Sequence, residues 1–193
     1  RDCLLSRGLG DVYKRQNMIC ATHGPIWRSH VCDIIAKYEK WSKYETDEGV
    51  VIAFSSMYGH TEQMADAIGR RLAEQGIRKI RIHDTSKTHP SYIINDIFRY
   101  KGVILGSCAY NGGIFPTMET LLNELECMGV KNHYLGYFGN KMWGGGAIPR
   151  FKTFAEKIKW EIVAEPSEAM GNMKPSDLSL IHISEPTRQE AIS

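Results

Sequence analysis

The chain has 193 residues and a formal net charge of +2, with 24 lysines and arginines against 22 aspartates and glutamates. This length fits one domain of ordinary size together with a short piece of another. The balanced charge gives no sign of a nucleic-acid or acidic membrane surface as partner, and no apolar run approaches the ~20 residues that a membrane-spanning helix needs. We therefore expect neither nucleic acid nor membrane as a partner.

The two ends of the chain are predicted to be foreign to the natural protein. Codons for residues 1 to 16 can be the reverse complements of codons for residues 193 to 178, as in Gln16 (CAG) against Leu178 (CTG). The deduced DNA resembles the tag that is ligated onto fragments for short-read sequencing. We therefore predict that residues 1–16 and 178–193 are translated adapter, with a natural inverted repeat as the alternative.

Four cysteines lie between these ends, at Cys20, Cys32, Cys108 and Cys127. They form no C-x-x-C pair and no dense framework. Free thiols of this kind fit a reducing compartment, so we expect a cytoplasmic protein.

The segment 17–48 is predicted to be separate from the rest of the chain. We expect a short strand at Met18–Ala21, which leads into Thr22–Arg28, and an amphipathic helix at Asp33–Tyr44. Thr46–Gly49 has the composition of a polar linker, so a domain boundary is placed there and the second domain covers residues 49–177.

From residue 49 onward, short apolar runs alternate with longer periodic stretches, a pattern typical of βαβ units. Strands are predicted at Val50–Ser55, Lys79–His83, Gly102–Ser107, His133–Phe138 and Glu161–Ala164. Helices are predicted at Thr61–Gln75, Ser91–Tyr100, Pro116–Met128 and Pro149–Lys157. We expect a doubly wound α/β fold whose last helix is missing, so that one face of the sheet is partly uncovered.

Three loops follow the first, third and fourth of these strands, and open parallel sheets bind ligands at that edge. The first loop, Ser56–Thr61, has no Lys or Arg, which argues against a nucleotide-binding P-loop, whose lysine reaches the nucleotide phosphates. The N–H groups at the helix start and the loop hydroxyls could still hold a phosphate. The second, Gly106–Gly113, and the third, Gly139–Ala147, combine glycines with one aromatic ring each. Tyr110 and Trp143 could sandwich a planar ligand or simply anchor their loops.

At these loops the sequence resembles the flavodiiron proteins, also called A-type flavoproteins. Ser-Met-Tyr-Gly-His-Thr (56–61), Tyr-Asn-Gly-Gly-Ile-Phe-Pro (110–116) and Trp-Gly-Gly-Gly-Ala (143–147) are similar to that family's FMN-binding loops. Thr22–Arg28 is similar to the end of its metallo-β-lactamase-like diiron domain. The resemblance covers residues 17–177 and implies a flavodoxin-like, five-stranded parallel sheet of order 2-1-3-4-5.

The resemblance also implies a role for each matching residue. The FMN phosphate would be held by Ser56, Met57, Gly59, His60 and Thr61, and the isoalloxazine ring would be surrounded by Tyr110, Asn111, Gly112, Gly113, Gly139, Trp143 and Gly145. Tyr58, Ser107 and Gly144 complete the predicted cofactor-binding set. His23 would be the last ligand of a diiron centre whose other ligands lie outside this chain; from spacing alone, a turn residue is the alternative. No catalytic residue is predicted.

Two departures from the family pattern bear on chemistry. His60 stands where the family usually has Asn, and a protonated imidazole would add a charge-assisted bond to the phosphate, making FMN retention mildly pH-dependent. Lys141 lies in a run that replaces Ser-Tyr-Gly. A cation near the flavin would favour the anionic reduced form and raise the potential, whereas a solvated surface lysine is the alternative.

The resemblance implies that the parent protein reduces dioxygen to water or nitric oxide to nitrous oxide at a diiron site supplied with electrons by FMN. This chain would be the FMN-binding electron-transfer module. Its expected partners are a redox donor, such as rubredoxin or a flavin reductase, and a second copy of the parent in a head-to-tail homodimer. A free-standing flavodoxin-type electron carrier and a non-redox α/β domain are the rival interpretations.

Overall fold

The computed structural model describes residues 17–172, which divide between Glu45 and Thr46 into two compact units. In the first unit, β1 (Ile19–Cys20) pairs antiparallel with β2 (Ile26–Trp27), and α2 (Val31–Ser42) comes next. The expected strand and helix of this segment are confirmed, whereas β2 was expected as loop. The predicted adapter segments lie outside the described residues.

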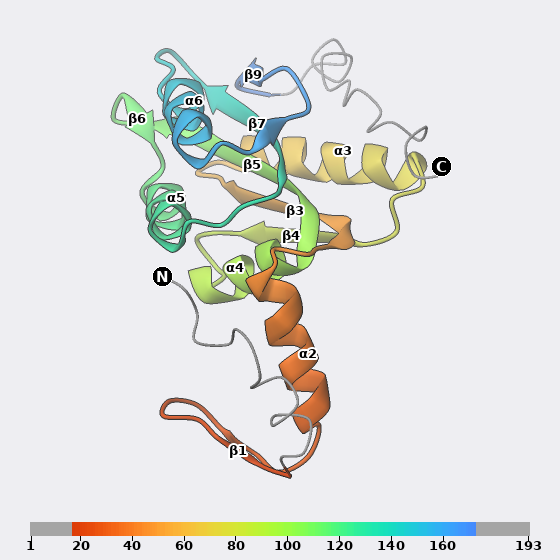
Figure 1. Cartoon of the computed structure of the whole chain (residues 1–193). Helices are drawn as coiled ribbons and strands as arrows, with labels where there is room; N and C mark the ends of the chain where they lie inside the picture. Colours follow the sequence, from red (N-terminus) through yellow and green to blue (C-terminus); the bar gives the residue numbers. More distant parts are fainter. Residues whose placement is uncertain (1–16, 173–193) are drawn as a thin grey trace. The chain divides into compact units, whose positions relative to one another are not determined.

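The second unit is built on a parallel sheet in the order β4-β3-β5-β7-β8 (Figure 1). Its strands are β3 (Asp47–Ser55), β4 (Ile80–Asp84), β5 (Tyr100–Tyr110), β7 (Tyr134–Lys141) and β8 (Glu161–Ile162). Two further strands join it: β9 (Ser167–Met170) pairs parallel with β7, and β6 (Gly113–Ile114) pairs antiparallel with β5. Counted along the chain this is the order 2-1-3-4-5, so the predicted fold is confirmed.

Four helices connect the strands of this unit: α3 (His60–Glu74), α4 (Pro90–Arg99), α5 (Pro116–Met128) and α6 (Ala147–Ile158). Proline opens α4 and α5, where its missing N–H breaks no helical hydrogen bond. Gly129 closes α5 with φ 61°, the left-handed conformation that glycine adopts without strain.

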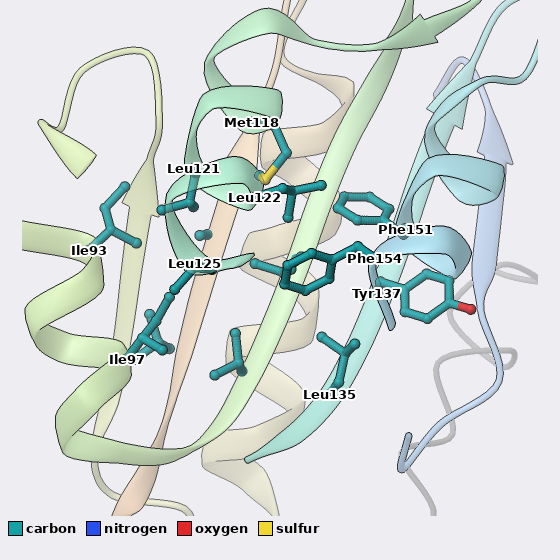
Figure 2. Packing of buried hydrophobic residues seen from close by; sticks show 14 of the residues in the cluster. Ile93, Ile97, Met118, Leu121, Leu122, Leu125, Leu135, Tyr137, Phe151 and Phe154 are labelled. Atoms are coloured by element: carbon teal, nitrogen blue, oxygen red, sulfur yellow. The ribbon is translucent and has the colours of Figure 1, made fainter. Parts of the chain in front are cut away.

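The sheet is buried between two hydrophobic clusters. On one face, α4, α5 and α6 pack against the sheet, and Figure 2 shows Leu121, Leu125, Phe151 and Phe154 in the same hydrophobic cluster as Leu135. On the other face, the side chains of α3 pack against inward-facing residues of β3 and β7. Continuous burial from residue 50 to 55 explains why β3 is one apolar run rather than an alternating strand.

The face covered by α3 is partly exposed at the edge strand β4, whereas the expected absence of a last helix concerns residues outside the described range. Ile82 of β4 pairs with Ile52 and so shares its face of the sheet, yet Ile82 is 41% exposed. Among residues 17–172, α3 supplies all the helical side chains of this cluster. None of the helices in the described range has the length and apolarity that crossing a bilayer requires.

Two boundaries differ from the sequence-based prediction. The fifth strand was expected to end at Ala164, but it breaks after Ile162 and pairing with β7 resumes as β9. Leu135 of β7 pairs with Ile162, and Phe138 pairs with Ser167. The β8–β9 segment therefore contains two more residues than β7 over this interval. The expected linker 46–49 is mostly the start of β3, which carries a bulge before Val50. In both places backbone pairing overrides a polar local sequence.

Candidate cofactor-binding site

The three loops of interest begin at one edge of the sheet. Ser55 at the end of β3 pairs with Ser107 of β5, and Ser107 pairs with Gly139 of β7. The carboxyl ends of these neighbouring strands therefore lie side by side, at the edge that carries β6 and the start of α6 (Figure 1). An open α/β sheet binds ligands at this edge.

The first loop turns the chain from β3 into α3. Gly59, the N-cap of α3, has φ 86°, a left-handed conformation that favours glycine, and its N–H donates to Ser56 Oγ at 3.0 Å. No side chain caps the helix start. The first N–H groups of α3 therefore remain available to an anion, which the helix dipole also favours.

Two buried polar atoms at this helix start have no hydrogen-bond partner within residues 17–172: Thr61 Oγ1 and His60 Nδ1. Thr61 is only 1% exposed. A buried polar group without a partner costs about 1–3 kcal/mol, so native proteins keep few of them. A phosphate here would accept a hydrogen bond from the Thr61 hydroxyl, and from His60 when Nδ1 carries a proton. These residues therefore fit the phosphate of FMN.

The second loop is a tight hairpin. β5 runs on to Tyr110 and returns as β6 through Asn111 and Gly112, whose φ values of 47° and 75° are those of a type I′ turn. The Tyr110 ring contacts Phe115 edge-on, with 5.6 Å between ring centroids, and the residue is 39% exposed. Tyr110 thus anchors its loop and still presents part of its ring to the edge.

Cys108 belongs to the second loop and contacts the first. Burial raises the pKa of its thiol, and a hydrogen bond with the backbone of Met57 acts in the opposite direction. The thiol therefore stays protonated at neutral pH and ties the two loops together.

Ser107, a predicted cofactor-binding residue, is fully buried. Its hydroxyl donates to the Cys108 carbonyl at 2.9 Å, accepts from the Phe115 N–H at 3.2 Å and lies 2.8 Å from Ser55 Oγ. All these partners are protein groups, so the Ser107 side chain fastens the second loop to the end of β3.

The third loop leaves β7 after Lys141 and exposes its aromatic ring. Trp143 is 91% exposed, and a Cβ built on Gly144 would meet nothing within 4 Å. Gly139, also predicted to line the ring, is buried in β7, where a Cβ would lie 3.2 Å from Ile148. Trp143 and Gly144 therefore have open space beside them, whereas Gly139 is packed against Ile148 inside the protein.

The second and third loops touch each other at glycines. A Cβ built on Gly146 would overlap the carbonyl oxygen of Gly112, closer than side chains tolerate. Since the obstacle is backbone, it cannot swing aside. Glycine at position 146 is therefore what brings these two loops together.

Two side-chain anchors of the third loop were missed by the sequence-based prediction. Asn140 donates through Nδ2 to the carbonyl of Gly171 at 2.7 Å, and Lys141 forms an ion pair with Glu168 of β9. Both contacts depend on β9, which was not predicted. A strand signal over residues 167–170 would have been needed to find them.

His23, the predicted iron ligand, lies in the first unit and is exposed. No group of three or more His, Cys, Asp or Glu side chains within residues 17–172 is placed to hold a metal ion. One imidazole does not fit a two-iron centre, so the residues described here do not form that site.

A cavity of about 580 Å³ lies away from the loop edge, where α5 and α6 end. Its lining includes Glu126, Gly129, Lys131, Lys157 and Lys159. At the loop edge, by contrast, the aromatic side chains of Tyr58 and Trp143 are 77% and 91% exposed.

Comparison with known proteins agrees with this fold. The flavodoxin family model matches residues 52–184. The anaerobic nitric oxide reductase flavorubredoxin of Escherichia coli O1:K1 is 29% identical over 147 residues, which cover 76% of this chain and 31% of that protein. The chain therefore spans about a third of the length of these curated relatives.

Two solved structures show the same fold. The rubredoxin oxygen:oxidoreductase of the anaerobe Desulfovibrio gigas matches with a TM-score of 0.77 and 25% identity, covering 84% of this chain and 41% of that one. Flavodoxin 1 of Bacillus cereus matches with a TM-score of 0.61 and 20% identity, covering 68% of this chain and 90% of that one. The chain therefore belongs to the flavodoxin family, and its flavodoxin-like, FMN-type domain is of the kind that forms part of flavodiiron proteins.

Proposed function

We propose that this chain is the FMN-binding electron-transfer module of a flavodiiron oxidoreductase that reduces dioxygen to water, nitric oxide to nitrous oxide, or both. The observation that carries the proposal is the meeting of three loops at one sheet edge, next to a helix start whose buried Thr61 hydroxyl has no partner among residues 17–172. When bound, FMN would accept electrons from a donor and pass them to the metal site.

The first loop would hold the phosphate end of FMN. Thr61 Oγ1 and the free N–H groups of α3 would donate to phosphate oxygens, with Ser56, Met57, Tyr58 and Gly59 forming the turn that shapes the cradle. His60 would add a charge-assisted bond when protonated. Neutralisation would come from N–H and O–H dipoles, because the loop carries no Lys or Arg.

The second and third loops would hold the isoalloxazine ring. Tyr110 and Trp143 are the exposed aromatic side chains of these loops, and Asn111, Gly112 and Gly113 form the hairpin beside them. Gly144 and Gly145 would let backbone approach the ring closely. Ser107 and Gly139 are buried in the strands, so they would act indirectly, by fixing the positions of the second and third loops.

The flavodiiron assignment rests on the front of the chain. The Desulfovibrio gigas protein covers 84% of the chain, whereas the Bacillus cereus flavodoxin covers 68%. The difference between these two shares of the chain is comparable in length to residues 17–48. This segment lies outside the flavodoxin-like unit. His23 in this segment would be one iron ligand of the parent protein, with the others supplied upstream.

Two kinds of partner are implied by this proposal. The electron donor would be a small redox protein such as rubredoxin, or a flavin reductase, since similar proteins carry rubredoxin in their names. The second partner would be another copy of the parent protein, paired head to tail. We propose that this protein and its partners are located in the cytoplasm.

Binding of FMN to the full 193-residue chain tests the proposal. We expect quenching of flavin fluorescence that saturates at one FMN per chain, and at least about tenfold weaker binding of riboflavin, which lacks the phosphate. No saturable quenching, or equal affinity for the two flavins, would contradict it. The intact gene separates the rivals: a His-x-Glu-x-Asp-His motif upstream supports the flavodiiron assignment, and its absence supports a free-standing flavodoxin.

A further inference from the structure

An ion pair links the end of β7 to the start of β9, next to the third loop. Lys141 Nζ contacts Glu168 Oε2. Glu168 pairs with Gly139 in the strand register, and Lys141 lies two positions beyond Gly139, so both side chains stand on the same face of the sheet. They are 32% and 23% exposed, so the pair is partly shielded from water.

The backbone of the third loop rests on this pair. A Cβ built on Gly145 would lie 2.9 Å from Glu168 Oε1 and 3.3 Å from Lys141 Cδ. The loop therefore starts at Lys141 and passes over the Glu168 carboxylate at Gly145, with Trp143 between. Glu168 thus pairs with Lys141 and lies directly below Gly145 of the same loop.

This arrangement changes what Lys141 can do to a nearby flavin. Two-electron reduction with uptake of one proton leaves a negative charge on the ring, and a free ammonium nearby would favour that reduced form. A carboxylate in contact with the ammonium cancels most of its field at longer range, because opposite potentials subtract. The sequence-based expectation that Lys141 raises the potential treated it as an uncompensated charge.

We propose that Glu168 is a positioning residue that sets the reduction potential of bound FMN. It compensates the charge of Lys141 and holds the ammonium beneath Gly145. This inference rests on the proposed function, because it requires FMN at the loop edge.

The test is a cycle of charge-neutralising variants of the full chain, measured as the midpoint potential of bound FMN. Glu168→Gln frees the ammonium and should shift the potential upward, while Lys141→Gln frees the carboxylate and should shift it downward. The double variant should return close to the parent value. Glu168→Asp keeps the charge and should restore most of the parent potential.

A second ion pair provides the matched control. Arg71 Nη1 and Glu74 Oε2 lie 3.1 Å apart in the last turn of α3, at the end of the helix opposite to the phosphate cradle. Arg71→Gln and Glu74→Gln make the same changes in net charge and should leave the potential unchanged. FMN affinity and the unfolding midpoint of each variant are measured in parallel.

The outcomes separate charge compensation from simple support of the fold. Shifts of opposite sign that cancel in the double variant support the proposal. Shifts of the same sign, or weaker FMN binding at an unchanged potential, would overturn it, because a purely structural role predicts these results. A parent chain that binds no FMN would instead overturn the proposed function, and the role of Glu168 with it.

Discussion

The side-chain oxygens of Ser55 and Ser107 lie 2.8 Å apart at the last position where β3 pairs with β5. Ser107 donates to a backbone carbonyl, so Ser55 is the donor of this bond. The pair fixes the spacing of the two strands at the point where their loops diverge. The two side chains form part of the frame that keeps the proposed phosphate and ring sites in register.

Replacing Ser107 with Ala should destabilise the protein by about 1–3 kcal/mol, because the Ser55 hydroxyl and the Phe115 N–H lose a buried partner. Urea unfolding measures this loss. The double variant Ser55→Ala/Ser107→Ala should lose less than the sum of the two single variants, since one orphaned hydroxyl is removed with its partner. Strict additivity would show that the two hydroxyls do not interact.

Replacing Thr61 with Val should weaken FMN binding without weakening the fold. Valine keeps the shape of threonine and removes a buried hydroxyl that has no partner among the described residues. We expect an FMN dissociation constant about tenfold higher or more, and an unfolding midpoint of the apo protein that is unchanged or raised. Thr120→Val, on the exposed face of α5, is the control and should leave FMN binding alone. A destabilised apo protein would mean that Thr61 serves the fold.

Replacing His60 with Asn should remove a pH-dependent part of FMN affinity. A protonated imidazole would donate a charge-assisted bond to the phosphate, which a neutral asparagine cannot do. The parent should therefore gain affinity over the variant as the pH falls. Flavin fluorescence titrations of both proteins at several pH values give the ratio of their dissociation constants, in which the titration of the phosphate itself cancels. A ratio of dissociation constants that does not change with pH would refute a phosphate contact by His60.

Replacing Gly146 with Ala should push the second and third loops apart. The new methyl group would overlap the Gly112 carbonyl, and this backbone cannot rotate away. Gly144→Ala is the matched control, because its methyl group would meet nothing within 4 Å of the protein. Thermal unfolding of the two apo proteins should show a lower midpoint for Gly146→Ala only. Equal midpoints would show that the loops do not depend on this contact.

Replacing Glu126 with Gln should destabilise the protein in a pH-dependent way. Burial raises the pKa of Glu126, but hydrogen bonds from Lys157 and Arg150 outweigh it, so that the net pKa is lowered from 4.5. A carboxyl whose pKa is lowered by folding contributes stability above its unfolded pKa and loses it as the pH falls. The parent should exceed the variant by about 1–2 kcal/mol at pH 7, and the gap should close toward pH 3. Urea unfolding at both values measures it, and a constant gap would contradict this account.

The parts of the site that depend on local sequence were predictable. β3 is a continuous apolar run, and Gly59 ends the loop after it, so the first loop could be placed between a strand and a helix. In a parallel sheet the carboxyl ends of neighbouring strands lie at the same edge, so the loops that follow them are brought to that edge. The shared edge of the three loops was therefore within reach before the structure was known.

The anchors of the third loop were not predictable, for a physical reason. Ser167–Met170 comes directly after a proline and has no strand pattern of its own, so its pairing with β7 depends on the tertiary fold. The ion pair of Lys141 with Glu168 joins residues 27 positions apart in the chain and exists only if that pairing forms. The sequence could identify Lys141 as an unusual residue, but it could not show that Glu168 neutralises its charge.

The most direct test of an FMN site at this edge is the perturbation of backbone amide signals by FMN, measured by NMR on the full chain. We expect the largest changes at Gly59–Thr61, Tyr110–Gly113 and Trp143–Gly145, and almost none at residues 129–132, which line the cavity at the ends of α5 and α6. Changes concentrated at residues 129–132, with the three loops unaffected, would contradict the account.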